Sequence, residues 1–111
     1  MAVSKTELFD ATLQERANLF KALGHPARLQ ILQFLSQTKT CISGDISEEL
    51  PLSRTTVKQH LLELKEVGLI RGQVEGAKTN YCLDYEKVAA MKILFGNFLD
   101  ELQIPDNLCC T

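Results

Sequence analysis

The side chains best suited to chemistry in this chain lie between positions 53 and 60. They are hydroxyl, amide, imidazole and cationic groups with no acid among them: Ser53, Arg54, Thr55, Thr56, Lys58, Gln59 and His60. Arginine can hydrogen-bond guanine at two atoms, glutamine can do the same with adenine, and serine or threonine can bond bases or phosphates. Double-stranded nucleic acid is therefore the partner that this segment fits.

The cysteines form a second group with potential chemistry, at Cys41, Cys82, Cys109 and Cys110. No two of them make a CxxC pair, and the chain has only two histidines, which excludes a zinc-finger or zinc-ribbon framework. In a reducing cytosol we expect free thiols. Cys82 follows a tyrosine in an expected strand and is interpreted as a small buried hydrophobe. Cys41 is either a core thiol or a ligand, and the tail pair either binds a ligand or has no role.

Length and charge limit the classes of protein that the chain can belong to. Its 111 residues are enough for one domain with a modest core. No apolar run approaches the roughly 18 residues that would span a bilayer, and no secretory signal opens the chain, so we expect a cytoplasmic protein with no membrane partner. The net charge is −2, yet residues 54–78 contain five Lys or Arg against three Glu. Basic charge is thus concentrated at and just after the polar segment.

Hydrophobic spacing predicts a series of helices that would position this segment. Apolar residues three and four apart indicate a helix within residues 6–23, which Gly24 ends. A second helix begins at Pro26, and a short one is expected within residues 43–50, with Ser43 or Asp45 near its start. Ser53 can cap the next helix, and Gly68 can supply its left-handed exit. The core-facing positions of the second and fourth helices are Ala27, Ile31, Leu35, Val57, Leu61 and Leu64.

The pattern changes after Gly68 from helical spacing to alternation. Residues 70–74 and 79–83 flank the glycine turn "EGAK", which predicts a two-stranded hairpin. One face of this hairpin is apolar, and the other carries Arg71, Gln73, Lys78 and Asn80. Asp84 can cap a last helix whose apolar face is wider than one small domain would use, so a partner chain should cover it. We expect a folded unit over residues 1–104 and a tail over residues 105–111.

Two short helices followed by a basic hairpin make a winged helix-turn-helix. The expected fold is mainly α with a small β-hairpin wing, assembled as a homodimer. In such a motif the second helix enters the major groove with its N-terminal residues nearest the base edges. The polar segment occupies that end here, and the hairpin could reach the flanking backbone or the minor groove.

Four stretches of this sequence resemble successive elements of the ArsR/SmtB family of bacterial metal-responsive repressors. They are "LFKALGHPARLQILQFL", "CISGDISEEL", "LSRTTVKQHLLELKEVGLI" and "RGQVEGAKTNYCLD", from Leu19 to Asp84. The resemblance implies a winged-helix fold that dimerises through its first and last helices. It also implies a repressor that occupies an inverted-repeat DNA operator until an effector releases it.

The effector implied by the resemblance depends on where this chain departs from the family. Arsenic-responsive members have Cys-Val-Cys-Asp where this chain has Cys41-Ile42-Ser43-Gly44-Asp45, and residues 84–102 lack the histidines of zinc- and nickel-type members. Cys41, Cys109 and Cys110 remain, in a pattern similar to members that take thiols from the C-terminal tail. Three thiolates would suit a soft ion such as trivalent arsenic or antimony. No other cofactor is expected.

Other interpretations stay open beside a metal-responsive repressor. Polar residues on an isolated helix most often form a solvated face, and His60 could make a structural hydrogen bond rather than a DNA contact. The scaffold could serve as a protein-interaction module, although the acid-free segment argues against it, or as a repressor of this fold without a metal site. An enzyme is excluded because the chain shows no phosphate loop, nucleophile–base spacing or paired carboxylates.

Overall fold

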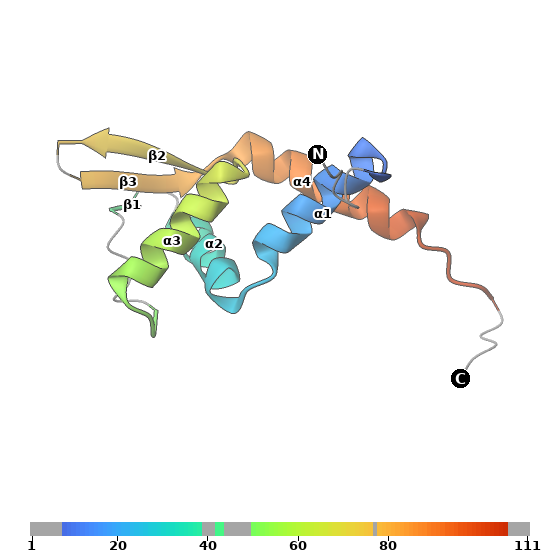
Figure 1. Ribbon diagram of the computed structural model, residues 1–111, viewed down its shortest axis with the longest axis horizontal. Helices are drawn as coiled ribbons and strands as arrows, with labels where there is room; N and C mark the ends of the chain where they lie inside the picture. The colour runs from blue at the N-terminus through green and yellow to red at the C-terminus, as the bar shows by residue number, and fades with distance from the viewer. Residues whose placement is uncertain (1–7, 39–41, 44–49, 77, 107–111) are drawn as a thin grey trace.

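The computed structural model describes residues 8–38, 42–43, 50–76 and 78–106 (Figure 1). The described elements are α1 (Ala11–Leu23), α2 (Pro26–Thr38), β1 (Ile42–Ser43), α3 (Arg54–Glu66), β2 (Ile70–Glu75), β3 (Lys78–Leu83) and α4 (Tyr85–Glu101). Helices α1 and α4 lie together at one end of the molecule, and α2, α3 and the sheet form the other end (Figure 1). None of the described helices is long and apolar enough to cross a membrane.

The helix boundaries follow the capping residues expected from the sequence. The Ser53 hydroxyl oxygen accepts the Thr56 N–H at 3.3 Å at the start of α3, and the Asp84 carboxylate accepts the Lys87 N–H at 3.1 Å at the start of α4. After α3, Gly68 has a φ of 84°, a left-handed conformation that other residues rarely adopt. These contacts fix where the polar segment begins and where the chain turns back into the hairpin.

The core joins α2, α3 and the hairpin, as the apolar spacing predicted. Ile31 and Leu35 of α2 pack with the α3 stripe and with the apolar face of the strands, and these side chains are almost fully buried. The cluster comprises Ile31, Leu35, Leu50, Val57, Leu61, Leu64, Leu69, Ile70, Tyr81 and Leu83. Because one face of α3 is held in this core, its opposite face is presented outward.

The sheet has three strands in the order β1-β3-β2, whereas the sequence predicted two. β1 pairs with β3 through Ile42 opposite Tyr81 and Ser43 opposite Asn80. Ser43 therefore belongs to a strand and not to the start of the expected short helix, whose residues 44–49 lie outside the described residues. A two-residue strand leaves no alternation to recognise, so its pairing with β3 could not be read from the sequence.

Cys82 also differs from expectation, because it is disulfide-bonded in this structure. The register places Cys82 opposite Arg71, on the face of the sheet away from buried Tyr81 and Leu83. Strand alternation therefore keeps its sulfur out of the core, where an inert thiol had been expected. The bonding partner lies outside the described residues.

Loss of the α3 cap gives a first stability prediction. Ser53→Ala removes the oxygen that accepts the Thr56 N–H, and we expect it to lower the free energy of unfolding by roughly 1 kcal/mol. Urea denaturation followed by circular dichroism measures this. Thr55→Ala, an exposed change in the same helical turn, is the control and should stay within about 0.5 kcal/mol of the parent. Equal losses in the two variants would contradict the cap.

Candidate nucleic-acid interface

The outward face of α3 carries four of the seven side chains within residues 53–60 that were predicted to contact DNA. Arg54, Thr55, Lys58 and Gln59 are exposed, while Val57, Leu61 and Leu64 on the other side are buried. Positions 54, 55, 58 and 59 share one helical face because residues four apart lie one turn above each other. The first turn of α3 contains no acid, so nothing on it repels a phosphate. We call this set the reading face.

Ser53 and Thr56 occupy the same end of α3 but contact each other. Besides accepting the Thr56 N–H, the Ser53 hydroxyl donates to the Thr56 hydroxyl oxygen at 3.0 Å. A hydroxyl has one proton and two acceptor sites, so this pairing uses most of the hydrogen-bonding capacity of Ser53. The structure thus gives Ser53 a structural role in holding the first turn of the reading face.

His60 lies away from the reading face, which disagrees with its expected place on the DNA-contacting surface. Only 8% of the residue is exposed, and its Nδ1 accepts a hydrogen bond of 3.1 Å from Arg28 Nε. The His25 ring packs on it with centroids 4.4 Å apart. Burial, followed by the charges of His25 and Arg28, lowers the pKa of His60 from its ordinary value. His60 is therefore a neutral acceptor inside the fold, in line with the structural hydrogen bond left open above.

The sequence did not predict a role for Arg28. Among the described residues, its partly buried guanidinium nevertheless makes several polar contacts, with both α1 and α3. Its guanidinium also donates to the main-chain oxygens of Lys21 and Ala22 and pairs with the Glu63 carboxylate. An arginine directly after the buried Ala27, on the edge of an apolar stripe, is the signal that could have indicated it. Periodicity alone does not distinguish such a residue from a solvated one.

The wing places the predicted residues Arg71, Gln73 and Asn80 on one face by register. Arg71 stands opposite Cys82, Gln73 opposite Asn80, and the backbone of Lys78 opposite Glu75. Arg71 and Gln73 are exposed, and Asn80 is half-buried. Val74 was expected on the apolar face, but it is 75% exposed because the hairpin tip extends beyond the core (Figure 1).

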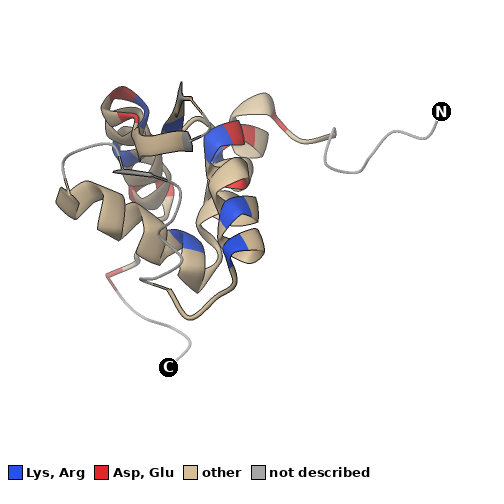
Figure 2. Ribbon diagram, turned by 90° about the vertical axis from the view of Figure 1, so that its left-hand side faces the viewer, with Lys and Arg blue, Asp and Glu red and all other residues tan. Residues whose placement is uncertain are grey.

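Charge is mixed over the molecule as a whole. Figure 2 shows Lys and Arg segments interspersed with Asp and Glu segments, without one side of a single sign. Non-specific attraction to a polyanion would therefore be weak, in keeping with the net charge of −2. If the chain binds DNA, the local arrangement on the reading face and the wing, and not bulk charge, must supply the affinity.

The candidate thiol ligands Cys41, Cys109 and Cys110 lie outside the described residues. Within residues 8–38, 42–43, 50–76 and 78–106 no group of three or more His, Cys, Asp or Glu could hold a metal ion. The two histidines come together, but the Arg28 guanidinium beside them would repel a cation. The histidine pair is therefore not a metal centre.

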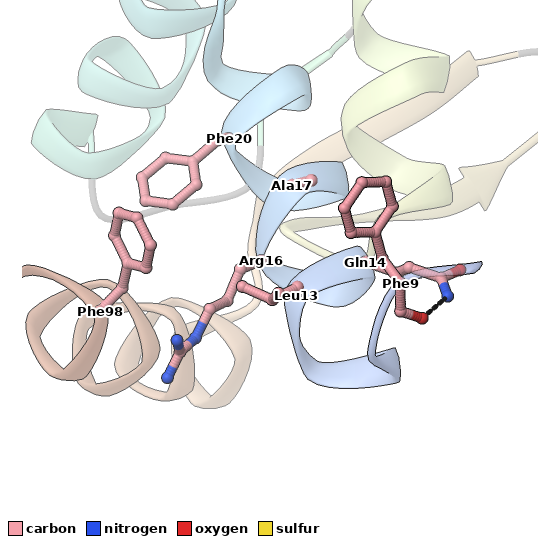
Figure 3. A pocket seen from close by; sticks show the side chains of 7 residues that line it. All are labelled: Phe9, Leu13, Gln14, Arg16, Ala17, Phe20 and Phe98. Carbon is pink, nitrogen blue, oxygen red and sulfur yellow. Dashed lines mark hydrogen bonds between the residues drawn. The ribbon is translucent and has the colours of Figure 1, made fainter. Parts of the chain in front are cut away.

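A separate apolar groove lies between α1 and α4, at the opposite end of the molecule from the wing. It has a volume of about 440 Å³, and Figure 3 shows the Phe20 and Phe98 rings side by side, where they pack edge to face with centroids 5.5 Å apart. Its lining residues are Phe9, Leu13, Gln14, Arg16, Ala17, Phe20 and Phe98. Arg16 holds the two helices together through two hydrogen bonds to the Glu101 carboxylate, at 2.6 and 3.0 Å, and these lower the pKa of Glu101.

Helix α4 adds apolar surface beside this groove, since none of its residues is buried. Ile93 and Leu99 are 66% and 60% exposed, and Phe9 and Leu13 of the groove are 59% and 45% exposed. Exposed apolar side chains on neighbouring helices are typical of a protein interface. Leu99 belongs to the wide apolar face predicted for the last helix, and α1 adds exposed apolar side chains of its own.

Known proteins match a large part of this chain, including α2 and the reading face on α3. The model of the arsR family of bacterial regulatory proteins matches residues 25–71. The HTH-type transcriptional regulator YgaV of Escherichia coli (strain K12) is 34% identical over 88 residues, which cover 78% of this chain and 89% of YgaV.

Solved structures agree with this assignment. An ArsR-like transcriptional regulator from Rhodococcus sp. RHA1 superposes with a TM-score of 0.69 at 25% identity, covering 83% of this chain and 86% of the other. The homodimeric winged helix-turn-helix DNA-binding domain of Mb0332 from Mycobacterium bovis gives a TM-score of 0.64 at 32% identity, over 91% and 92%. The described architecture is the same winged helix-turn-helix, and the matched proteins are transcriptional regulators and not enzymes. This chain belongs to the arsR family of bacterial regulatory proteins.

Proposed function

We propose that this regulator binds an inverted-repeat DNA operator as a homodimer and represses transcription by occupying it. The single observation that carries the proposal is the reading face, an exposed and acid-free surface on an α3 held rigidly by the core. Arg54 and Gln59 provide the groups that read bases, and Lys58 with the wing residue Arg71 provides cations for the backbone. Such a regulator acts in the cytoplasm, where its operator is.

The homodimer rests on the surface formed by α1 and α4. In one chain this surface leaves Phe9, Leu13, Ile93 and Leu99 largely exposed to water. A second copy would cover it by two-fold symmetry, so that each patch meets its own counterpart. The Mycobacterium bovis relative is homodimeric, which supports the same assembly here.

Selection of duplexes from a random pool, followed by footprinting, tests the DNA proposal. Two reading faces related by a two-fold axis should select half-sites with centres about one helical turn, ~34–36 Å, apart. The complex should contain two protein chains per duplex. Selection of a single half-site, or no sequence preference at about 150 mM salt, would contradict the proposed docking.

The proposed effector is a trivalent arsenic or antimony ion captured by Cys41, Cys109 and Cys110. Support comes from the chemistry of the three thiols, because soft ions prefer thiolate ligands. Ile42, the residue after Cys41, pairs with β3 of the wing, so a ligand held at Cys41 would act directly beside a DNA-binding element. Release requires only that the ion bind the DNA-free form better than the bound form.

Arsenite is therefore expected to weaken the operator complex about tenfold, within the usual range of allosteric coupling. Fluorescence anisotropy with a labelled operator measures this on fully reduced protein, because only free thiols can become the thiolate ligands of the ion. The comparison is with Cys109→Ser/Cys110→Ser, which should keep DNA affinity and lose the response. An equal response in both proteins would remove the tail thiols from the sensor.

A further inference from the structure

The contacts of Arg28 connect three helices that must keep a fixed orientation in a DNA-binding dimer. From α2, the guanidinium reaches the last turn of α1 through the main-chain oxygens of Lys21 and Ala22, at 3.4 and 3.3 Å. It reaches α3 through His60 Nδ1 at 3.1 Å and through the Glu63 carboxylate. Only 16% of the Arg28 side chain is exposed, whereas the Glu63 side chain is 40% exposed. The bonds to His60 and Ala22 are therefore the ones partly shielded from water.

The position of this junction links the dimer surface to the reading face. Phe20, the residue before Lys21, lines the apolar groove, and His60 follows Gln59 of the reading face. Arg28 is thus the polar connection between the last turn of α1 and the helix that enters DNA. In a two-fold dimer, a rotation of α3 against α1 would change the separation of the two reading faces, and the DNA fixes that separation.

We propose that Arg28 is a positioning residue that holds α3 in its DNA-reading orientation, and that it does so only while His60 is neutral. This inference rests on the proposed DNA-binding function. Neutral imidazole with its proton on Nε2 offers Nδ1 as an acceptor, whereas the protonated ring has only N–H donors. Protonation therefore replaces the Arg28–His60 hydrogen bond with two donors and two positive charges facing each other.

The surroundings of His60 favour its neutral form. The charged and titratable groups near the ring are Arg28 and His25 from the α2 side, with Glu63 on α3 itself bonded to Arg28. The contacts from α1 are two main-chain carbonyl oxygens, which carry no charge. The opposite face of α3 packs against the apolar core, in which Tyr81 is the one titratable residue of the described cluster. Burial is the largest cause of the lowered pKa of His60, before the charges of His25 and Arg28.

The sign of the pH dependence distinguishes this role from a direct DNA contact. The ordinary pKa of histidine is 6.5 and that of His60 is lowered, so the bonded junction is complete above pH 6.5 and is lost as the pH falls below it. Operator affinity should fall on acidification. A histidine that contacted phosphate would gain charge at low pH, and affinity would rise instead.

The experiment measures operator affinity of the reduced, full-length dimer from pH 8 to pH 5.5 at constant salt. Wild type should lose affinity below pH 6.5. His60→Asn should bind like wild type at pH 8 and show no such loss, because the amide oxygen replaces Nδ1 as an acceptor that does not titrate. Arg28→Lys keeps the charge but cannot serve all of these acceptors, and should bind about tenfold more weakly at pH 8. His25→Asn is the second comparison: the acid loss should remain but move to higher pH, because the charge of His25 no longer lowers the pKa of His60.

Two outcomes would overturn the positioning role. The first is an acid loss in His60→Asn equal to that of wild type, and the second is wild-type affinity for Arg28→Lys at pH 8. Circular dichroism and sedimentation on each variant exclude unfolding or dissociation as the cause of a loss.

Nitrogen NMR of the histidine rings gives a readout that does not depend on DNA. It should show His60 with its proton on Nε2 and with a midpoint below that of an exposed histidine. A proton on Nδ1 would refute the junction itself. A correct tautomer combined with no specific DNA binding at any pH would instead refute the proposed function.

Discussion

Leu13→Glu is expected to dissociate the dimer and to weaken binding to inverted-repeat DNA at least ~100-fold. Leu13 lines the apolar groove and is 45% exposed in the single chain, so the glutamate can stay solvated and the monomer should fold normally. In the dimer each copy would bury an unpaired carboxylate, and such a charge costs several kcal/mol. A monomer reaches one half-site at a time, so it loses the contacts of the second reading face.

Sedimentation at micromolar concentration and operator titration together measure this effect. Leu29→Glu is the matched control, since Leu29 is 47% exposed and lies on α2, outside the groove. The control should remain dimeric and bind as the parent does. A dimeric Leu13→Glu variant with unchanged affinity would show that α1 does not form the dimer surface.

The fold followed from the sequence wherever local signals and burial agreed. Ser53 and Asp84 cap α3 and α4 as predicted, and Gly68 makes the left-handed exit. In each of these cases one side chain, or the absence of one, satisfies a specific backbone requirement, so residue type alone is informative. The buried face of α3 could also be predicted from the sequence, because its apolar residues recur at the helical spacing.

Features that depend on contacts between residues far apart in the sequence could not be predicted in this way. His60 has the residue type of a DNA contact but sits 8% exposed against Arg28, 32 positions away in the chain. In α3, His60 stands between the exposed Gln59 and the buried Leu61, so it lies at the edge of the buried face. Patterns of residue type do not fix such a boundary, whereas packing against α2 does.

The α1–α4 surface is a different case. The sequence predicted apolar helix faces here, but a single chain does not bury them completely. The apolar spacing of α1 rests on Phe9, Leu13, Ala17, Phe20 and Leu23. Of these, Leu23 packs against the core, whereas the other four line a groove. Periodicity predicts which face is apolar and not what covers it. The winged-helix core forms without this face, which is therefore available for a partner.

Substitutions on the reading face should separate base reading from backbone attraction. Arg54→Ala removes a two-atom contact worth roughly 1–3 kcal/mol if it meets guanine, and a two-fold dimer loses it twice, so the total is about 2–6 kcal/mol. The loss should be confined to operators carrying the recognised base, and preference at that position should relax. Titration of wild type and variant against single-base operator mutants measures both effects.

Lys58→Ala should act on all sequences alike, because a lysine that meets phosphate carries no base information. Losing one phosphate contact per chain should flatten the slope of log K against log salt by about 1.8 for the dimer. Lys92→Ala, an exposed lysine of α4, makes the same change in net charge away from the reading face and should leave the slope unchanged. If Arg54→Ala and Lys58→Ala both bound the best duplex as wild type does, α3 could not be the helix that enters the groove. If Lys58→Ala relaxed specificity while Arg54→Ala changed only the salt slope, α3 would still enter the groove but with the two roles exchanged, which would mean a helix rotated from the proposed docking.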